Sequence, residues 1–227
     1  MVTERSFGED EPPGDPFLYG VMDRLVQGFA AEEHAAELAR AREAYEARRG
    51  HVREDEELWE RWSQIFLEWF ALEWRGETDG LPPAARALAS EEDERTRAAL
   101  RAWLRSQRAL VEVVALRPGA VRVRDLLRGG LFEVAEQRSL HGVDAGDVAE
   151  VRLIGFDGRV RFGRTFLFHP HGARDVLAEQ IAQRLAQGAS PDDVLDHCAQ
   201  LRLRTERYRH VDPIRLYRAA GEELGEA

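Results

Sequence analysis

The stretch LVEVVALRPGAVRVRDLLRGGLFEVAEQ, residues 110–137, decides the fold. Apolar residues in it alternate with arginine or glutamate, which is the period-two pattern of strands with one covered face. Two turn signals, Pro118-Gly119 and Gly129-Gly130, divide it into three strands. The pattern continues in VAEVRLIGF (148–156), RVRF (159–162) and RTFLF (164–168). Such short strands joined by tight turns predict a small antiparallel barrel, SH3-like or OB-like, because closure hides the strand edges.

Helical patterns flank these strands, because apolar residues recur there at every third or fourth position. The most apolar segment is LWERWSQIFLEWFALEW (58–74), whose aromatic stripe is typical of a helix in a protein core. Gly50 is a plausible end for the helix before it, and Ser190-Pro191 is a strong helix start. The expected helices cover 17–49, 58–74 and 81–88, and four more begin at Ser90, after Gly172, at Ser190 and at Asp212.

The predicted fold class is therefore α+β. An α-helical N-terminal half precedes the small antiparallel barrel, and C-terminal helices pack back on it. We divide the chain into a disordered acidic tail (1–15), a helical region (16–109), the barrel (110–170) and the C-terminal helices (171–227).

Composition excludes several function classes. All 32 basic residues are arginine, so Schiff-base lysines and the lysine of phosphate loops are absent. A single cysteine, Cys198, allows no internal disulfide. The sequence shows neither a transmembrane run nor a signal peptide, so we expect a cytoplasmic protein that does not contact membranes. Residues 1–100 carry 24 acidic residues against 12 arginines, whereas residues 101–227 carry 18 against 20.

The order of these parts resembles a domain of uncharacterised bacterial proteins, some of which carry a C-terminal SEC-C zinc knuckle. The matching pattern covers about residues 58–170 and includes the Pro118-Gly119 turn, Asp125-Leu126-Leu127 and the Gly146-Asp147 turn. The resemblance implies a fold rather than an activity. The knuckle needs a close Cys/His cluster, which this sequence lacks beside Cys198, so no zinc function is carried over.

Arginines in the predicted strands are the first candidate binding residues. Alternation with apolar residues puts them on the outer face of the barrel, where barrels of this kind bind RNA, single-stranded DNA or peptides. Glutamates on the same strands dilute the positive charge, and aromatic side chains are missing from the polar face. The candidates are Arg122, Arg124, Arg152, Arg159 and Arg161.

The pair His169 and His171 is the candidate metal site. Residues i and i+2 of an extended segment point to the same side, so both imidazoles could meet one ion. Zinc would need a third ligand, and the sequence places none nearby. The alternative is a simple joint between a strand and a helix. His197-Cys198 is a weaker candidate, because adjacent residues of a helix point in different directions.

We interpret the chain as a non-catalytic binding or adaptor protein with an unknown protein partner. The first alternative is a nucleic-acid-binding protein that uses the arginine-bearing barrel face, and the second is a metal-dependent enzyme centred on His169 and His171. The sequence indicates no cofactor. The N-terminal helices could form an oligomer by pairing with another copy.

Overall fold

The computed structural model describes residues 6–7, 15–31, 34–76, 79–138 and 140–222. Its α-helices are α1 (Pro16–Gly28), α2 (Ala35–Arg49), α3 (Trp59–Leu72), α4 (Pro83–Ser90), α5 (Glu94–Leu104), α6 (Arg174–Ala186), α7 (Pro191–Arg207) and α8 (Pro213–Glu222), with a short 3₁₀ turn, η2 (His171–Ala173). Its strands are β1 (Ser6–Phe7), β2 (Gln107–Arg117), β3 (Ala120–Asp125), β4 (Leu131–Ala135), β5 (Leu140–His141), β6 (Val148–Phe156), β7 (Arg159–Phe162) and β8 (Leu167–Phe168). This is the expected α+β class.

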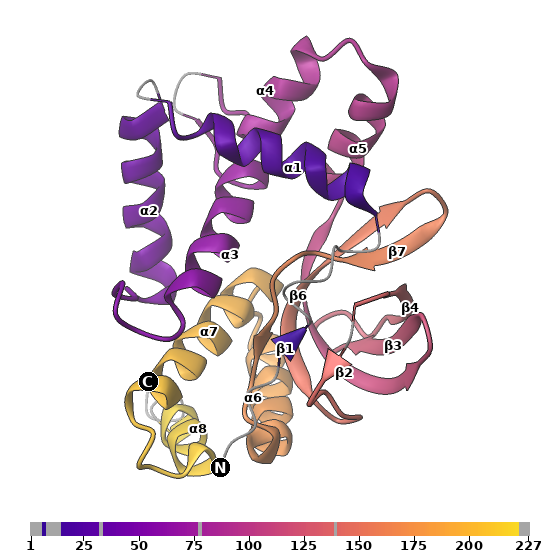
Figure 1. The fold of residues 1–227 in the computed structure, drawn as a ribbon. Coiled ribbons are helices and arrows are strands. Elements are labelled where there is room, and N and C mark those ends of the chain that lie inside the picture. The colour runs from indigo at the N-terminus through magenta and orange to yellow at the C-terminus, as the bar shows by residue number, and fades with distance from the viewer. Residues whose placement is uncertain (1–5, 8–14, 32–33, 77–78, 139, 223–227) are drawn as a thin grey trace.

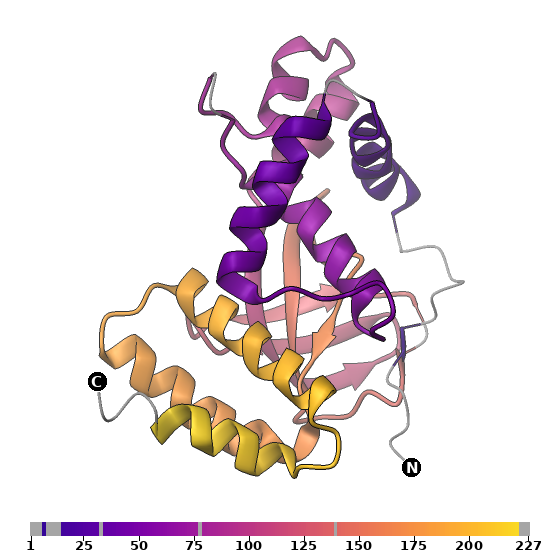
Figure 2. The same cartoon turned by 90° about the vertical axis from the view of Figure 1, so that its left-hand side faces the viewer.

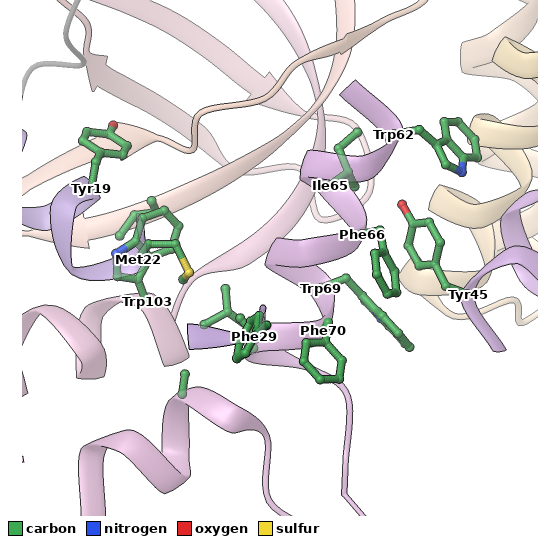
Figure 3. Packing of buried hydrophobic residues seen from close by; sticks show 14 of the residues in the cluster. Tyr19, Met22, Phe29, Tyr45, Trp62, Ile65, Phe66, Trp69, Phe70 and Trp103 are labelled. Carbon is green, nitrogen blue, oxygen red and sulfur yellow. The ribbon is translucent and has the colours of Figure 1, made fainter. Parts of the chain in front are cut away.

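The N-terminal helices enclose an aromatic core centred on α3 (Figure 3). The predicted aromatic stripe of α3 is buried, and Phe66 is fully inaccessible. Tyr45 of α2 meets Phe66 with ring centroids 5.3 Å apart, and Phe29 meets Phe70 edge-on at 4.8 Å. Buried aromatic side chains contribute a large apolar area each, so this cluster is the main hydrophobic support of the helical half.

Six strands form one mixed sheet in the order β2-β3-β4-β7-β6-β8, and β2 also pairs with β6. The pairings therefore run in a ring from β2 through β3, β4, β7 and β6 back to β2. All of these pairs are antiparallel except β4–β7, which is parallel. A ring of five strands cannot alternate in direction throughout, so one parallel pair is unavoidable. The purely antiparallel arrangement that we expected is corrected by this pair.

The C-terminal helices lie against the sheet and against the helical half. Figures 1 and 2 show α7 running between α2 on one side and α6 and α8 on the other. The start of α7 is a capping box in which Ser190 and Asp193 cap each other's backbone, with Pro191 in the first turn, as the sequence indicated. No helix in the described part of the chain combines the length and the apolar character needed to cross a bilayer.

Several predicted boundaries differ from the structure. The helix expected over 17–49 is two helices, because the chain turns after Gly28 and buries Phe29 against α3. Gly50 ends α2 as predicted, with a positive φ of 95°. The helix that we expected to begin at Ser90 is α5, and its start is corrected: Asp93, not Ser90, accepts the backbone hydrogen bond that caps it.

The tail predicted to be disordered lies mostly outside the described residues. Within it, Ser6–Phe7 forms β1, which pairs antiparallel with β5. Asp15 caps α1 through its side chain, which accepts a hydrogen bond from the backbone nitrogen of Leu18. These three residues are therefore ordered by contacts rather than free.

Candidate binding face and buried charge network

The outer side of β3 carries two of the predicted arginines. Arg122 and Arg124 alternate with the buried Val121 and Val123, so both guanidiniums point away from the core. We call Arg122, Arg124 and Leu131, which lie on the outer side of β3 and β4, the β3 face. Pairing places Arg124 opposite Leu131 of β4. The sequence therefore predicted the orientation of both β3 arginines.

Some charged side chains on and beside the β3 face have an oppositely charged partner among the described residues, and others have none. Arg124, with 55% of its side chain exposed, lies 3.4 Å from Glu112. Arg174 of α6 also binds Glu112. Neither Arg122 nor Arg159 makes an ion pair or side-chain hydrogen bond with the described residues. Arg122 is thus an exposed guanidinium on a strand with neighbours on both sides, whereas Arg159 lies on the β6–β7 hairpin.

An apolar side chain is exposed at the same place. Four large hydrophobic side chains are exposed among the described residues, and one of them, Leu131 (49%), belongs to the β3 face. Leu116 (39%) stands opposite the buried Val121 and therefore lies on the other side of the sheet, and Leu81 and Tyr208 lie outside the helices and strands. A surface that mixes arginine with exposed apolar side chains has the composition of a protein interface.

Arg152 and Arg161 do not lie on an outer face, and this part of the expectation is corrected. Arg152 is buried and binds Glu73 of α3 at 2.5 Å and Glu68 at 3.4 Å. Arg161 is also buried and lies 3.3 Å from Asp15. Both sides of β6 are covered, so alternation along this strand does not separate a wet face from a dry one.

A buried charge network joins the helical half, the sheet and α7. Arg49, at the end of α2, is 1% exposed and donates to Glu150 of β6 at 2.6 Å and to Asp196 of α7 at 3.1 Å. Arg108 of β2 lies 3.4 Å from Asp196, 3.8 Å from Glu150 and 3.2 Å from Glu73. Buried charges are tolerated when they are paired and hydrogen-bonded.

The pKa values of Glu73 and Arg49 are shifted toward their charged forms. Burial would raise the pKa of Glu73, but the guanidiniums of Arg152 and Arg108 outweigh it and hold the pKa below its usual range. Burial would lower the pKa of Arg49, yet the opposite charge of Glu150 raises it overall. Glu68 is the exception, because burial raises its pKa despite the nearby Arg152. The sequence analysis missed the network, although Glu150 in an otherwise apolar strand was a signal for it.

The candidate metal pair does not converge. His169 is 1% exposed, and its Nδ1 lies 2.6 Å from the hydroxyl of Tyr217 on α8. His171 is half-exposed, and its Nδ1 lies 2.8 Å from Asp147. The described residues include no group of three or more His, Cys, Asp or Glu side chains that could hold a metal ion. The geometry therefore favours the joint between strand and helix.

The remaining candidate sites are the Cys198 thiol, the His197 imidazole and the space inside the sheet. Burial raises the pKa of the Cys198 thiol to about 12, which opposes a thiolate nucleophile. Burial also lowers the pKa of His197 to about 4. The apolar space inside the sheet, which Val111, Phe162 and Phe168 help to line, has a volume of about 10 Å³. That volume holds at most one water molecule, so this space is too small for a ligand.

No family model matches the sequence, and neither a curated protein nor a solved structure matches the chain. The resemblance of residues 58–170 to a bacterial domain stays a prediction.

Proposed function

We propose that this chain is a non-catalytic binding protein that holds a protein partner on the β3 face. The observation that carries the proposal is Arg122, an exposed guanidinium with no described partner, fixed on a strand on the same side of the sheet as Arg124 and the exposed Leu131. Arginine is enriched in interfaces because its planar fork makes several directed hydrogen bonds while its stem packs on apolar groups.

The ring of strand pairings supports this proposal. We propose that the ring closes as a small barrel, and the parallel β4–β7 pair favours the OB-like form of the two that the sequence suggested. In OB-like barrels the ligands bind to the second and third strands and to the neighbouring loops. Those strands correspond to β3 and β4, which carry Arg122, Arg124 and Leu131.

Binding of single-stranded nucleic acid is the second candidate function, and the same barrel geometry favours it. Stacking of bases on exposed aromatic side chains usually accompanies such binding. The exposed large hydrophobic side chain of the β3 face is a leucine, Leu131, and Glu133 is exposed directly opposite Arg122. For these reasons we propose a protein partner in preference to a nucleic acid.

Oligomers through the N-terminal helices remain a prediction. Leu18, Met22 and Tyr45 of α1 and α2 are buried in the chain's own core. None of the exposed large hydrophobics of the described residues lies on α1, α2 or α3.

The test compares two matched double variants as bait. Arg122→Glu with Leu131→Ser changes the β3 face, and Arg105→Glu with Leu81→Ser makes the same changes at exposed residues elsewhere. We expect at least one protein from a cell lysate to be retained equally by wild type and control. Its retention should fall about tenfold on the β3-face variant, because central interface residues dominate affinity.

Quantitative mass spectrometry after nuclease treatment measures the retained proteins. Tryptophan fluorescence and circular dichroism of each bait check that the variants fold. The proposal is wrong if no retained protein distinguishes the β3-face variant from the control. If nuclease treatment abolishes the difference in retention between the two variants, the β3 face binds nucleic acid, which is the second candidate function.

A further inference from the structure

The spacing of the two β3 arginines limits what can bind them. Arg122 and Arg124 are residues i and i+2 of one strand, so their Cα atoms lie roughly 6.6 Å apart on the same side. Pairing with β2 and β4 fixes the strand that carries them. An extended peptide repeats its side chains at the same interval, so alternate carboxylates would meet the two guanidiniums in turn.

Both guanidiniums can accept a further carboxylate. Arg122 has no competing partner among the described residues. Arg124 uses one nitrogen, Nη1, for Glu112, and a guanidinium has five N–H donors. Glu112 keeps its contact with Arg174 when Arg124 turns toward a ligand. Charge-assisted pairs of this kind are stronger than neutral hydrogen bonds.

The width of the available surface favours an extended segment over a helix. Glu133, with 65% of its side chain exposed, stands opposite Arg122 on the neighbouring strand. Glu133 lies 3.7 Å from Arg117 of β2, so part of its charge is already balanced. Strands are about 4.8 Å apart, so a single extended segment along β3 covers less of the neighbouring strands than a helix does. A helix about 10 Å across would cover Glu133 and bring its own carboxylates near that charge.

We infer that the β3 face binds an extended peptide segment of a partner protein, with acidic side chains at alternate positions beside Arg122 and Arg124 and an apolar residue against Leu131. This inference rests on the proposed function and names its ligand. A nucleic-acid backbone also carries regular negative charge, but the bases of single strands stack on aromatic side chains, and the described residues of the β3 face include none.

Selection from a random dodecapeptide display library tests the inference on the full chain. Enriched peptides should carry Asp or Glu at positions i and i+2, with an apolar residue nearby. The best peptide is then labelled with fluorescein, and its affinity is measured by fluorescence anisotropy. Arg122→Ala should weaken it about tenfold, whereas the exposed control Arg105→Ala should leave it unchanged. Labelled oligothymidylate is measured in the same assay.

Several outcomes would overturn the inference. These are no enrichment, acidic residues spaced at i and i+4, equal effects of Arg122→Ala and Arg105→Ala, and tighter binding of oligothymidylate than of the peptide. The proposed function and this inference can be tested independently of each other. If the lysate partner depends on the β3 face while selection yields no alternating acidic motif, the inference is wrong and the binding function stands.

Discussion

Arg49 carries the most completely buried charge of the network. Its guanidinium lies between Glu150 and Asp196 and also faces the rings of Tyr45 and Trp62 at 5.3 and 5.5 Å. Removing one member of a buried ion pair leaves the other charge without compensation, which costs more than the pair itself contributes. Arg49 therefore determines whether two carboxylates can remain in the interior.

We predict that Arg49→Met lowers the free energy of unfolding by about 3 kcal/mol, the lower end of the usual range because Arg108 still faces both carboxylates. Urea titration measures it without changing ionic strength. Arg105→Met, at an exposed arginine, should change the value by less than about 0.5 kcal/mol. Arg49→Met with Glu150→Met should recover part of the loss. A loss below about 1 kcal/mol for Arg49→Met would show that water reaches the network.

Residue patterns predicted some of these side chains and not others. Arg122 and Arg124 point outward as alternation indicated, and no described residue buries either side chain. Arg152 obeys the same alternation, yet α3 supplies Glu73 and Glu68 above it. A strand pattern predicts the side of the sheet on which a residue lies. Which element covers that side depends on contacts between residues that are distant in the sequence. Arg49 was unpredictable for the same reason.

At the scale of elements, the joint between β8 and α8 depends on His169. Its imidazole contacts Tyr217, which is fully buried on α8, and the backbone carbonyl of Tyr217 accepts a hydrogen bond from Gln180 of α6. Burial lowers the pKa of His169 from 6.5 to about 3, and the guanidiniums of Arg202 and Arg49 add to this effect. The folded joint thus requires a neutral imidazole.

This requirement predicts a pH dependence of stability. The unfolded chain takes up a proton at His169 near pH 6.5, whereas the folded chain does so only near pH 3. Stability is therefore lost as the pH falls from about 6.5, by up to roughly 1.4 kcal/mol per pH unit from this residue. Urea titrations between pH 7 and pH 5 should show a smaller slope for His169→Gln than for wild type.

Tyr217→Phe is the control for that experiment. It removes the hydroxyl but keeps the buried imidazole, so we expect lower stability at each pH by about 1 kcal/mol and the wild-type slope. Equal slopes for wild type and His169→Gln would mean that His169 is protonated in the folded chain.

Element boundaries were predictable where a local signal exists. The Asp157-Gly158 turn joins β6 and β7 with positive φ at both residues, as its sequence indicated. The break between α1 and α2 has no comparable signal, because it arises from the packing of Phe29 on Phe70. The strands themselves were predicted from their period-two pattern, whereas closure into a barrel stays a prediction. The parallel β4–β7 pair, which the sequence did not indicate, follows from the odd number of strands in the ring of pairings.

At the scale of the whole molecule, the charge network predicts that the parts unfold together. It joins α2, α3, β2, β6 and α7, so no part can separate without breaking ion pairs of the network. All five tryptophans lie in the helical half, and the one cysteine, Cys198, lies buried on α7. The chain thus contains separate natural probes for two of its parts.

We expect one urea midpoint from tryptophan fluorescence and from pulsed labelling of the Cys198 thiol. Arg49→Met should move both midpoints, and it should separate them if the network is what couples the parts. Different midpoints in the wild type would contradict a single cooperative unit.

The sequence separations within the network also bear on synthesis. Arg49 and Asp196 are 147 residues apart. At about 5–20 residues per second, a ribosome needs roughly 7–30 s to make the intervening chain. During that interval the guanidinium of Arg49 has no acceptor on α7, so α2 and α3 cannot reach their final packing as they emerge. The nascent N-terminal helices must wait for the far end of the chain, and their aromatic side chains are available to chaperones in the meantime.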